Sequence, residues 1–246
     1  MRSFKQSITT AKRVLQQLKH DPRTVALLLL IPLVLMAILR YVFGTNSQLF
    51  AKVGPLLIAV FPFTLMFVVT SISMLRERTS GTLERLLTTP ASKIGLLLGY
   101  GMAFGGLALL QVALTIGLCV SVLGLSVTGN LDLLAFVAVL DALLGMSLGL
   151  LISAFANSEF QAVQFMPAFV FPQLLVSGIF YPRPEMSALL QFLSDIFPMT
   201  YVVDGASRAS TGQYGGSTML IDVLVVVVII PASLCLGALT LRRQTN

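Results

Sequence analysis

Long uninterrupted apolar runs constrain this 246-residue chain more than any other feature of its sequence. Several runs reach the roughly 20 residues that a helix needs to cross the hydrocarbon core of a bilayer. Charged residues make up only 11% of the chain, whereas soluble domains carry roughly 25%. Backbone polar groups in lipid must be satisfied within the chain, and spanning helices achieve this. We therefore predict an all-α polytopic membrane protein with a single transmembrane domain over residues 1–246.

We expect six transmembrane helices, separated by charged segments or by segments rich in proline and glycine. Their expected ranges are 25–43, 53–75, 94–120, 131–154, 165–180 and 219–241. Short loops are expected at 44–52, 124–130 and 155–164. The fifth run is short for a full crossing and contains Pro167 and Pro172, so we expect this helix to break before it reaches the far surface.

The first 24 residues are predicted to form a basic amphipathic helix. Apolar residues recur at spacings of three and four, which places them on one helical face. These residues are Phe4, Ile8, Ala11, Leu15 and Leu18. Such a helix lies in the membrane interface, with its basic side chains toward anionic headgroups. The alternative is a plain solvated helix.

A second unusual segment, residues 181–217, separates the fifth and sixth apolar runs. Its first half carries an apolar stripe at helical spacing, which Pro198 ends. The stripe comprises Met186, Leu189, Leu190, Leu193, Ile196 and Phe197. It is too short to span a bilayer and too apolar to stand in water. We predict a re-entrant or interfacial helical hairpin, covered by protein or lipid headgroups.

The distribution of Lys and Arg predicts the orientation in the membrane. Twelve of the 16 lie in residues 1–24, in residues 76–93 and at the C-terminus, and four lie in the remaining segments. By the positive-inside rule, both termini are expected in the cytoplasm of a multi-pass protein of the plasma (inner) membrane. The loop at 155–164 carries no positive charge. The net charge of +6 follows from this loop bias, so no nucleic-acid partner is predicted.

Known catalytic and metal-binding patterns are missing from the sequence. It contains no GxxxxGK[S/T] phosphate loop, no G-x-S-x-G nucleophile motif and no His/Cys/Asp/Glu cluster. We expect its one histidine, His20, to be solvated, and Cys119 and Cys235 to be free thiols. The chain is therefore not expected to be an enzyme by itself or to bind a cofactor or metal.

Asp141 is the most unusual residue within a predicted span. It lies nine residues beyond Asp132, or about 13–14 Å along a helix, near the expected midplane. A carboxylate at this depth costs roughly 2.5 kcal/mol or more, so it should face protein or a watery cavity. It could serve a substrate pathway or a proton relay. The alternatives are a structural hydrogen bond to a neighbouring helix and a protonated acid without a functional role.

The charged island at 76–93 is the remaining candidate. It is predicted to form a short cytoplasmic helix, with Thr82 as a modest N-cap and with Pro90 at its end. The residues alone are consistent with two functions, a docking helix for another protein and a solvated loop that only sets the topology.

Residues 75–95, LRERTSGTLERLLTTPASKIG, resemble the hallmark of the type-2 ABC exporter permease family. The pattern E-(R/K)-x-x-G-T-x-E-x-L-x-x-T-P is matched by Glu77, Arg78, Gly81, Thr82, Glu84, Leu86 or Leu87, Thr89 and Pro90. Residues 177–186 and 197–208 are also similar to the family's late segment, through SGIFYP, PEM, FPMTY and Arg208. One departure is Met186-Ser187, where the family usually has proline after methionine.

The resemblance implies a half-transporter that pairs with a second permease chain, identical or different, and with two copies of a separate ATPase. ATP and Mg²⁺ would bind to that ATPase. The residues implied in ATPase coupling are Glu77, Arg78, Gly81, Thr82, Glu84, Arg85, Leu86, Thr89 and Pro90. The outer hairpin, with Pro198, Tyr201 and Arg208, would line or cap the exit. The cargo is expected to be amphiphilic, a drug, a lipid or a glycolipid, because apolar spans with little intramembrane charge favour this class over a small ion.

Two other functions remain open at this point. A proton-coupled secondary carrier could use Asp141, although the sequence shows no clear internal repeat of the kind such carriers contain. A membrane scaffold without transport activity is the third interpretation.

Overall fold

The computed structural model describes residues 2–44, 46–88, 93–213 and 215–240, and the regular structure in these ranges is entirely helical. The prediction of an all-α protein is therefore confirmed. The helices are α1 (Arg2–His20), α2 (Pro22–Val42), α3 (Ser47–Thr79), α4 (Thr82–Thr88), α5 (Lys93–Ser121), α6 (Leu131–Ile152), α7 (Glu159–Val176), the 3₁₀ helix η1 (Arg183–Glu185), α8 (Ala188–Ile196), α9 (Pro198–Thr211) and α10 (Ser217–Thr240).

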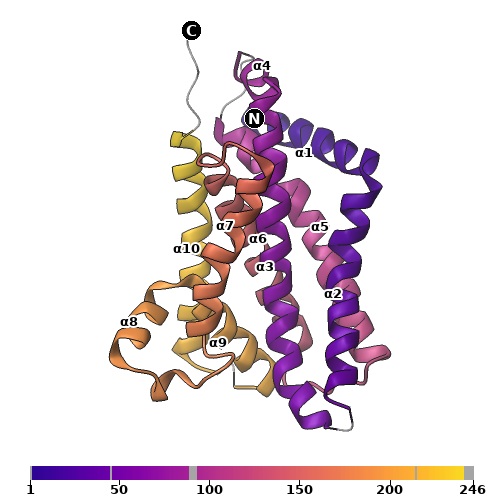
Figure 1. Ribbon diagram of the computed structural model, residues 1–246, viewed down its shortest axis with the longest axis vertical. Helices are drawn as coiled ribbons and strands as arrows, with labels where there is room; N and C mark the ends of the chain where they lie inside the picture. Colours follow the sequence, from indigo (N-terminus) through magenta and orange to yellow (C-terminus); the bar gives the residue numbers. More distant parts are fainter. Residues whose placement is uncertain (1, 45, 89–92, 214, 241–246) are drawn as a thin grey trace.

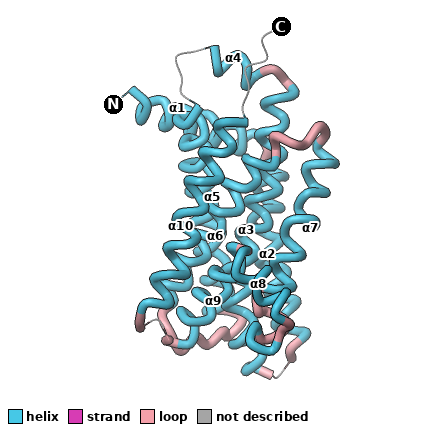
Figure 2. The backbone as a smooth tube through the Cα atoms, turned by 90° about the vertical axis from the view of Figure 1, so that its left-hand side faces the viewer, coloured by secondary structure: helices cyan, strands magenta, loops and turns pink. Residues whose placement is uncertain are grey.

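The long helices run along a common axis, and the short ones gather at its two ends (Figure 1). One end carries α4 and also α1, which lies across the bundle; we call it the α4 end. The opposite end carries α8 and α9 (Figure 2) and is called the α8 end. The two segments singled out in the sequence therefore lie at opposite ends of the bundle.

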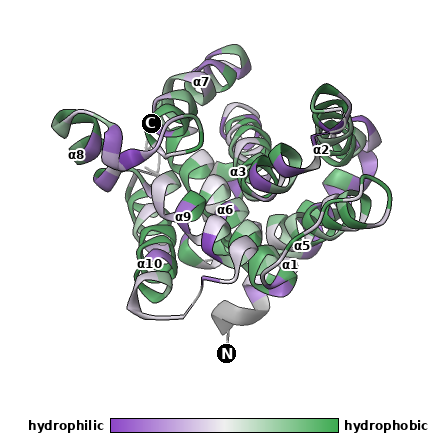
Figure 3. Cartoon of the chain, turned by 90° about the horizontal axis from the view of Figure 1, so that it is seen from below, coloured by the Kyte–Doolittle hydropathy of each residue, from purple (hydrophilic) through white to green (hydrophobic). Residues whose placement is uncertain are grey.

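Five helices in the described part of the chain are long and apolar enough to cross a membrane. These are α2, nearly all of α3, α5, α6 and α10. Their outward faces carry many exposed apolar side chains, as on α2 with Leu27, Leu30 and Val34. In Figure 3 the outer sides of α2 and α10 are strongly hydrophobic. This surface suits lipid rather than water, and the chain is a membrane protein.

The tightest packing lies between α3 and α6, where α6 is also surrounded by α5, α9 and α10 (Figure 3). Two glycines on α6 make this approach possible. A Cβ atom on Gly145 would lie 2.3 Å from the Phe63 carbonyl oxygen, and one on Gly149 would lie 2.4 Å from that of Phe67. Small residues of this kind let membrane helices approach closely. The GxxxG sequence therefore packs α6 against α3 within the chain.

Two of the predicted loop ranges are wrong, because in the structure helices extend into them. Helix α3 begins at Ser47, inside the expected loop 44–52, and Asn46 caps it by accepting a hydrogen bond from the Leu49 N–H at 3.1 Å. Helix α7 begins at Glu159, inside the expected loop 155–164. Its cap is Ser158, whose Oγ accepts from the Gln161 N–H at 3.2 Å. Both caps satisfy backbone donors of a first helical turn, so each helix begins earlier than its apolar run.

Helix α7 has 18 residues and contains Pro167 and Pro172. It stays helical through both prolines and ends at Val176, whereas the expected span covers residues 165–180. A membrane crossing by α7, and with it the total of six spans, remains a prediction. The same holds for the re-entrant placement of α8 and α9.

Candidate functional site

The α4 end contains most of the motif that resembles exporter permeases. Helix α3 continues to Thr79, so Glu77 and Arg78 belong to its last turn and not to the predicted short helix. The turn into α4 contains Gly81 at a φ of +70°, in the left-handed region that favours glycine. Thr82 is the first residue of α4 and does not precede it as the predicted N-cap. The motif therefore forms an elbow between a long helix and a short one.

The remaining motif residues lie in or after α4. Leu83 on its inner face is buried, whereas Arg85 is exposed and Leu86 is partly buried. Glu84 lies on α4, but its side chain falls outside the described residues. Thr89 and Pro90 fall outside them entirely.

Glu77 forms an ion pair within the chain. Its Oε1 lies 2.8 Å from Nη2 of Arg13 on α1, and the same nitrogen donates to Oε2 at 3.1 Å. The Glu77 side chain is only 7% exposed. The family motif implied an ATPase-coupling role for Glu77, and the structure shows this carboxylate bonded to the amphipathic helix.

Two neighbouring arginines connect the same turn of α3 to other helices. Arg76 forms a two-pronged ion pair with Glu159 at the start of α7, with Nε–Oε1 at 2.7 Å and Nη2–Oε2 at 3.0 Å. Arg78 donates a hydrogen bond to the Ser153 carbonyl at the end of α6. Three successive residues of α3 thus hold α7, α1 and α6. A displacement of this turn would act on all three helices.

Helix α1 rests directly on α5. A Cβ atom on Gly99 would lie 2.5 Å from Thr10 Cβ and 2.8 Å from the Ser7 carbonyl, so only glycine permits this contact. The Ser7 hydroxyl also donates to the Gly95 carbonyl at 3.0 Å. Helix α1 thus packs on the GxxxG pair of α5, Gly95 and Gly99.

Packing on α5 buries only some of the apolar residues of α1. Val14 and Leu18 are buried, whereas Ile8 and Leu15 are 44% and 47% exposed. The Phe4 side chain lies outside the described residues. Packing on α5 therefore uses a stripe offset from the predicted face and leaves Ile8 and Leu15 at the surface, and the interfacial location of that face stays a prediction.

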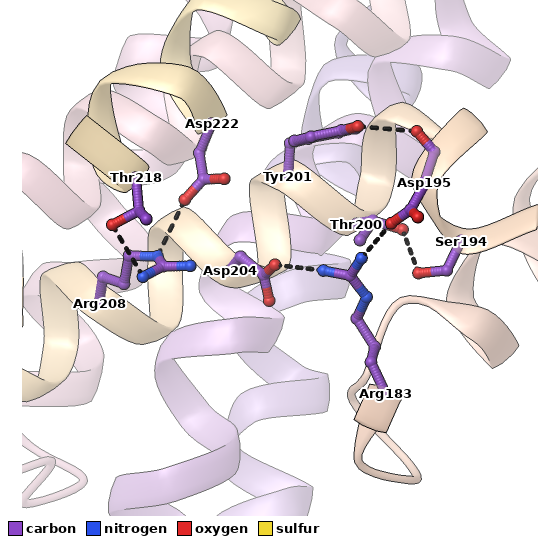
Figure 4. A network of polar contacts seen from close by, with 9 residues as sticks. All are labelled: Arg183, Ser194, Asp195, Thr200, Tyr201, Asp204, Arg208, Thr218 and Asp222. Atoms are coloured by element: carbon purple, nitrogen blue, oxygen red, sulfur yellow. Dashed lines mark hydrogen bonds and ion pairs between the residues drawn. The ribbon is translucent and has the colours of Figure 1, made fainter. Parts of the chain in front are cut away.

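The α8 end holds a second group of ion pairs (Figure 4). Arg183 of η1 points between two carboxylates, bonding Asp204 on α9 at 2.6 Å and also Asp195 on α8. Burial raises the pKa of the Asp204 carboxyl above its ordinary value, although the Arg183 guanidinium opposes the shift. The Tyr201 hydroxyl donates to the Asp195 carbonyl at 2.7 Å. These bonds hold α8 and η1 against α9.

Arg208 forms the remaining ion pair of this group, with Asp222 on α10. Its Nε lies 3.0 Å from the Asp222 carboxylate on α10, and its Nη1 donates to Thr218 Oγ1 at 3.1 Å (Figure 4). Pro198 is the first residue of α9, where the missing N–H of proline costs no helical hydrogen bond. The structure thus brings Tyr201 and Arg208 into one polar region.

Asp141 lies apart from these networks. It is fully buried in α6, one turn before Gly145, and neither carboxyl oxygen has a hydrogen-bond partner among the described residues. The structural hydrogen bond to a neighbouring helix, one of the alternatives for Asp141, is therefore not formed within the described part of the chain.

Sequence reasoning missed most partners in both groups, namely Arg13, Arg76, Glu159, Arg183, Asp195, Asp204 and Asp222. One signal was available for the start of α7, since Ser158 and Gln161 form an S-x-x-Q capping pattern before an apolar run. The ion pairs join residues up to 83 positions apart, and no local pattern indicates such partners.

Comparisons with known proteins give consistent results. The family described as ABC-2 type transporter matches residues 5–209. The chain is 31% identical to the probable multidrug ABC transporter permease YbhR of Escherichia coli over 62% of this chain and 41% of the relative. It is 29% identical to YbhS of that organism, also named a probable multidrug ABC transporter permease, over 72% of this chain and 47% of the relative. ABC transporter G family member 20 of Dictyostelium discoideum is 31% identical over 63% of this chain. That alignment covers 21% of the relative. The chain therefore spans less than half the length of each of these three relatives.

Proposed function

The chain belongs to the ABC-2 type transporter family, and from this premise we propose that it is the membrane permease subunit of an ATP-driven exporter. The observation that carries the proposal is the elbow at the α4 end. Helix α4 follows, after a short turn, the turn of α3 that holds α1, α6 and α7. A push on α4 by a partner would therefore reach most of the bundle.

In this proposal the partner is a separate ATPase subunit that supplies ATP and Mg²⁺. It docks on α4, with Glu84, Arg85, Leu86, Thr89 and Pro90 at or near the contact. Glu77 and Arg78 act within the chain and transmit the displacement, while Gly81 and Thr82 shape the elbow. The excess of Lys and Arg in the segments of the α4 end supports a cytoplasmic location for it.

The proposed topology has both termini in the cytoplasm of a plasma or inner membrane. Helix α7 serves as the fifth of six spans, and η1, α8 and α9 form the outer hairpin. A second permease chain, identical or related, completes the path. The cargo is amphiphilic, such as a drug, lipid or glycolipid. Two relatives carry the word multidrug in their names, which supports this class.

Charge reversal on α4 tests the proposal. Glu84→Arg is expected to abolish export and to reduce co-purification of a phosphate-loop ATPase at least tenfold, while membrane insertion stays normal. Asp132→Arg, an exposed site in the first turn of α6 at the opposite end, is the matched control and should leave both unchanged. If Glu84→Arg retains the ATPase and normal export, docking on α4 is wrong.

A proton-coupled carrier is a second candidate. The buried carboxyl of Asp141, which has no hydrogen-bond partner among the residues that the structure describes, favours it. Export measured with the proton gradient collapsed and ATP kept high separates the two. Continued export supports the ATP-driven permease. Loss of export, together with an inactive Asp141→Asn variant, supports the carrier.

A further inference from the structure

A cavity of about 930 Å³ lies at the α8 end, opposite the proposed ATPase contact on α4. It lies among the first turns of α3, the α5–α6 turn, the segment around η1, and α8 and α9. Its volume falls within the roughly 300–1,000 Å³ of small-molecule sites. Ser126, Thr128, Ser207, Ser210 and Thr211 supply hydroxyl groups to its lining. The cavity is therefore large and polar enough to hold a headgroup-sized ligand.

The charged side chains in the lining are Lys52, Arg183, Asp195 and Asp204. On the hairpin side, the single guanidinium of Arg183 is shared between two carboxylates (Figure 4). Arg208, which also acts on Asp204, is already paired with Asp222. This side thus has three carboxylates, those of Asp195, Asp204 and Asp222, and only two guanidinium groups. The Asp195 side chain is 62% exposed. This side of the cavity carries a net negative charge open to solvent.

On the α3 side, Lys52 supplies a positive charge. It is exposed, and no ion pair includes it in the part of the chain that the structure describes. An ammonium group is a compact point charge that suits a phosphate oxygen. Among the described residues, the cavity thus has an unpaired cation on α3 and surplus carboxylate on α8 and α9.

We propose that this cavity binds a zwitterionic headgroup, with its phosphate at Lys52 and its ammonium group at Asp195. A plain anion would leave the surplus carboxylate unmatched, and a plain cation would leave Lys52 unmatched. The hydroxyl groups of Ser126 and Ser207 can donate to phosphate oxygens, whereas those of Thr128, Ser210 and Thr211 donate to backbone carbonyls. Phe180 and Tyr181 are exposed aromatic residues in the lining, and aromatic rings of this kind attract a quaternary ammonium. Such binding requires neither ATP nor a partner subunit, so the inference is independent of the proposed transport function.

The sequence contains no tryptophan, so Phe180→Trp creates a single fluorescent reporter in the lining. The purified full chain in an uncharged maltoside detergent is titrated with glycerophosphocholine, with glycerol 3-phosphate and with choline. Saturable binding of the zwitterion, at least tenfold tighter than either half, is expected. Equal affinities for the three compounds would overturn the proposal, as would no emission change with either glycerophosphocholine or dihexanoyl-phosphatidylcholine.

Variants in the reporter background assign the two charges. Lys52→Ala should weaken zwitterion binding at least tenfold and leave choline binding unchanged. Asp195→Asn should weaken zwitterion and choline binding and spare glycerol 3-phosphate. Lys19→Ala, an exposed lysine on α1 at the other end, is the matched control and should change nothing. An unchanged zwitterion isotherm with Lys52→Ala, in a protein of normal thermal stability, refutes the site.

The same headgroup could come from a membrane phospholipid or from a soluble phosphodiester. Tenfold or tighter binding of dihexanoyl-phosphatidylcholine than of glycerophosphocholine identifies a lipid as the occupant. Similar affinities identify a site for the headgroup alone. Dependence on Lys52 supports the site in both cases.

Discussion

Arg13 and Glu77, which lie 64 positions apart in the sequence, form an ion pair that joins α1 to the last turn of α3. The Arg13 side chain is 27% exposed and that of Glu77 only 7%, so most of the pair is shielded from water. The turn that leads to α4 starts just beyond Glu77. The amphipathic helix is therefore bound to the elbow itself.

Removal of Arg13 should strongly destabilise the protein, because it leaves a buried carboxylate without its cation. Arg13→Ala is expected to cost about 3 kcal/mol of unfolding free energy. Lys12→Ala is the control, since its exposed neighbouring side chain should matter by less than about 0.5 kcal/mol. Denaturant unfolding in detergent measures both. Equal effects of the two substitutions would contradict a stabilising role for the pair.

The glycine contact between α3 and α6 should tolerate no added methyl group. In Gly145→Ala the new Cβ meets Phe63 backbone atoms at 2.3–2.9 Å, so the helices must separate, at a cost of about 1–3 kcal/mol. Gly106→Ala on α5 meets nothing within 4 Å and should be neutral or stabilising by up to about 1 kcal/mol. Thermal unfolding that ranks the two in the opposite order would refute this packing argument.

The elbow at Gly81 should require glycine for its backbone conformation and not for space. A Cβ atom there meets nothing within 4 Å, but the φ of +70° is strained for other residues. Gly81→Val is expected to cost about 1–3 kcal/mol locally. Gly81→Asn should be milder, because asparagine tolerates this region. Protease sensitivity between α3 and α4 reports the distortion. Equal sensitivity of the Val and Asn variants would show that the conformation is not limiting.

The ion pair between Arg76 and Glu159 should affect coupling more than stability. Both side chains are more than half exposed, and such pairs contribute about 0–1 kcal/mol. Arg76→Glu and Glu159→Arg are each expected to lower export several-fold with little change in thermal stability, and the charge-swapped double variant should recover export. Full export in both single variants would show that this ion pair plays no part in coupling.

Patterns along the chain predicted much of the fold. The apolar runs indicated long helices at α2, α3, α5, α6 and α10, and the charged island indicated the short α4. Helix ends were less predictable, because Asn46 and Ser158 extend α3 and α7 beyond their apolar runs. The cap patterns for both were present in the sequence, but hydropathy alone does not reveal them.

The candidate site was predictable only in part. The motif indicated Glu77 and Arg78 as coupling residues, but their partners Arg13 and Ser153 come from distant segments. The amphipathic period of α1 likewise could not show which stripe rests on α5, because Ser7 and Thr10 meet Gly95 and Gly99 only after folding.

The sequence by itself determined that this protein is helical and lies in a membrane, because hydropathy and local backbone hydrogen bonding act over a few turns of one segment. Its motif also identified the family. Only the tertiary structure decided that Glu77 bonds α1, that Arg76 holds α7, and that Lys52 and Asp195 line one cavity. These relationships depend on how helices dock, and docking brings together charges that no local pattern relates.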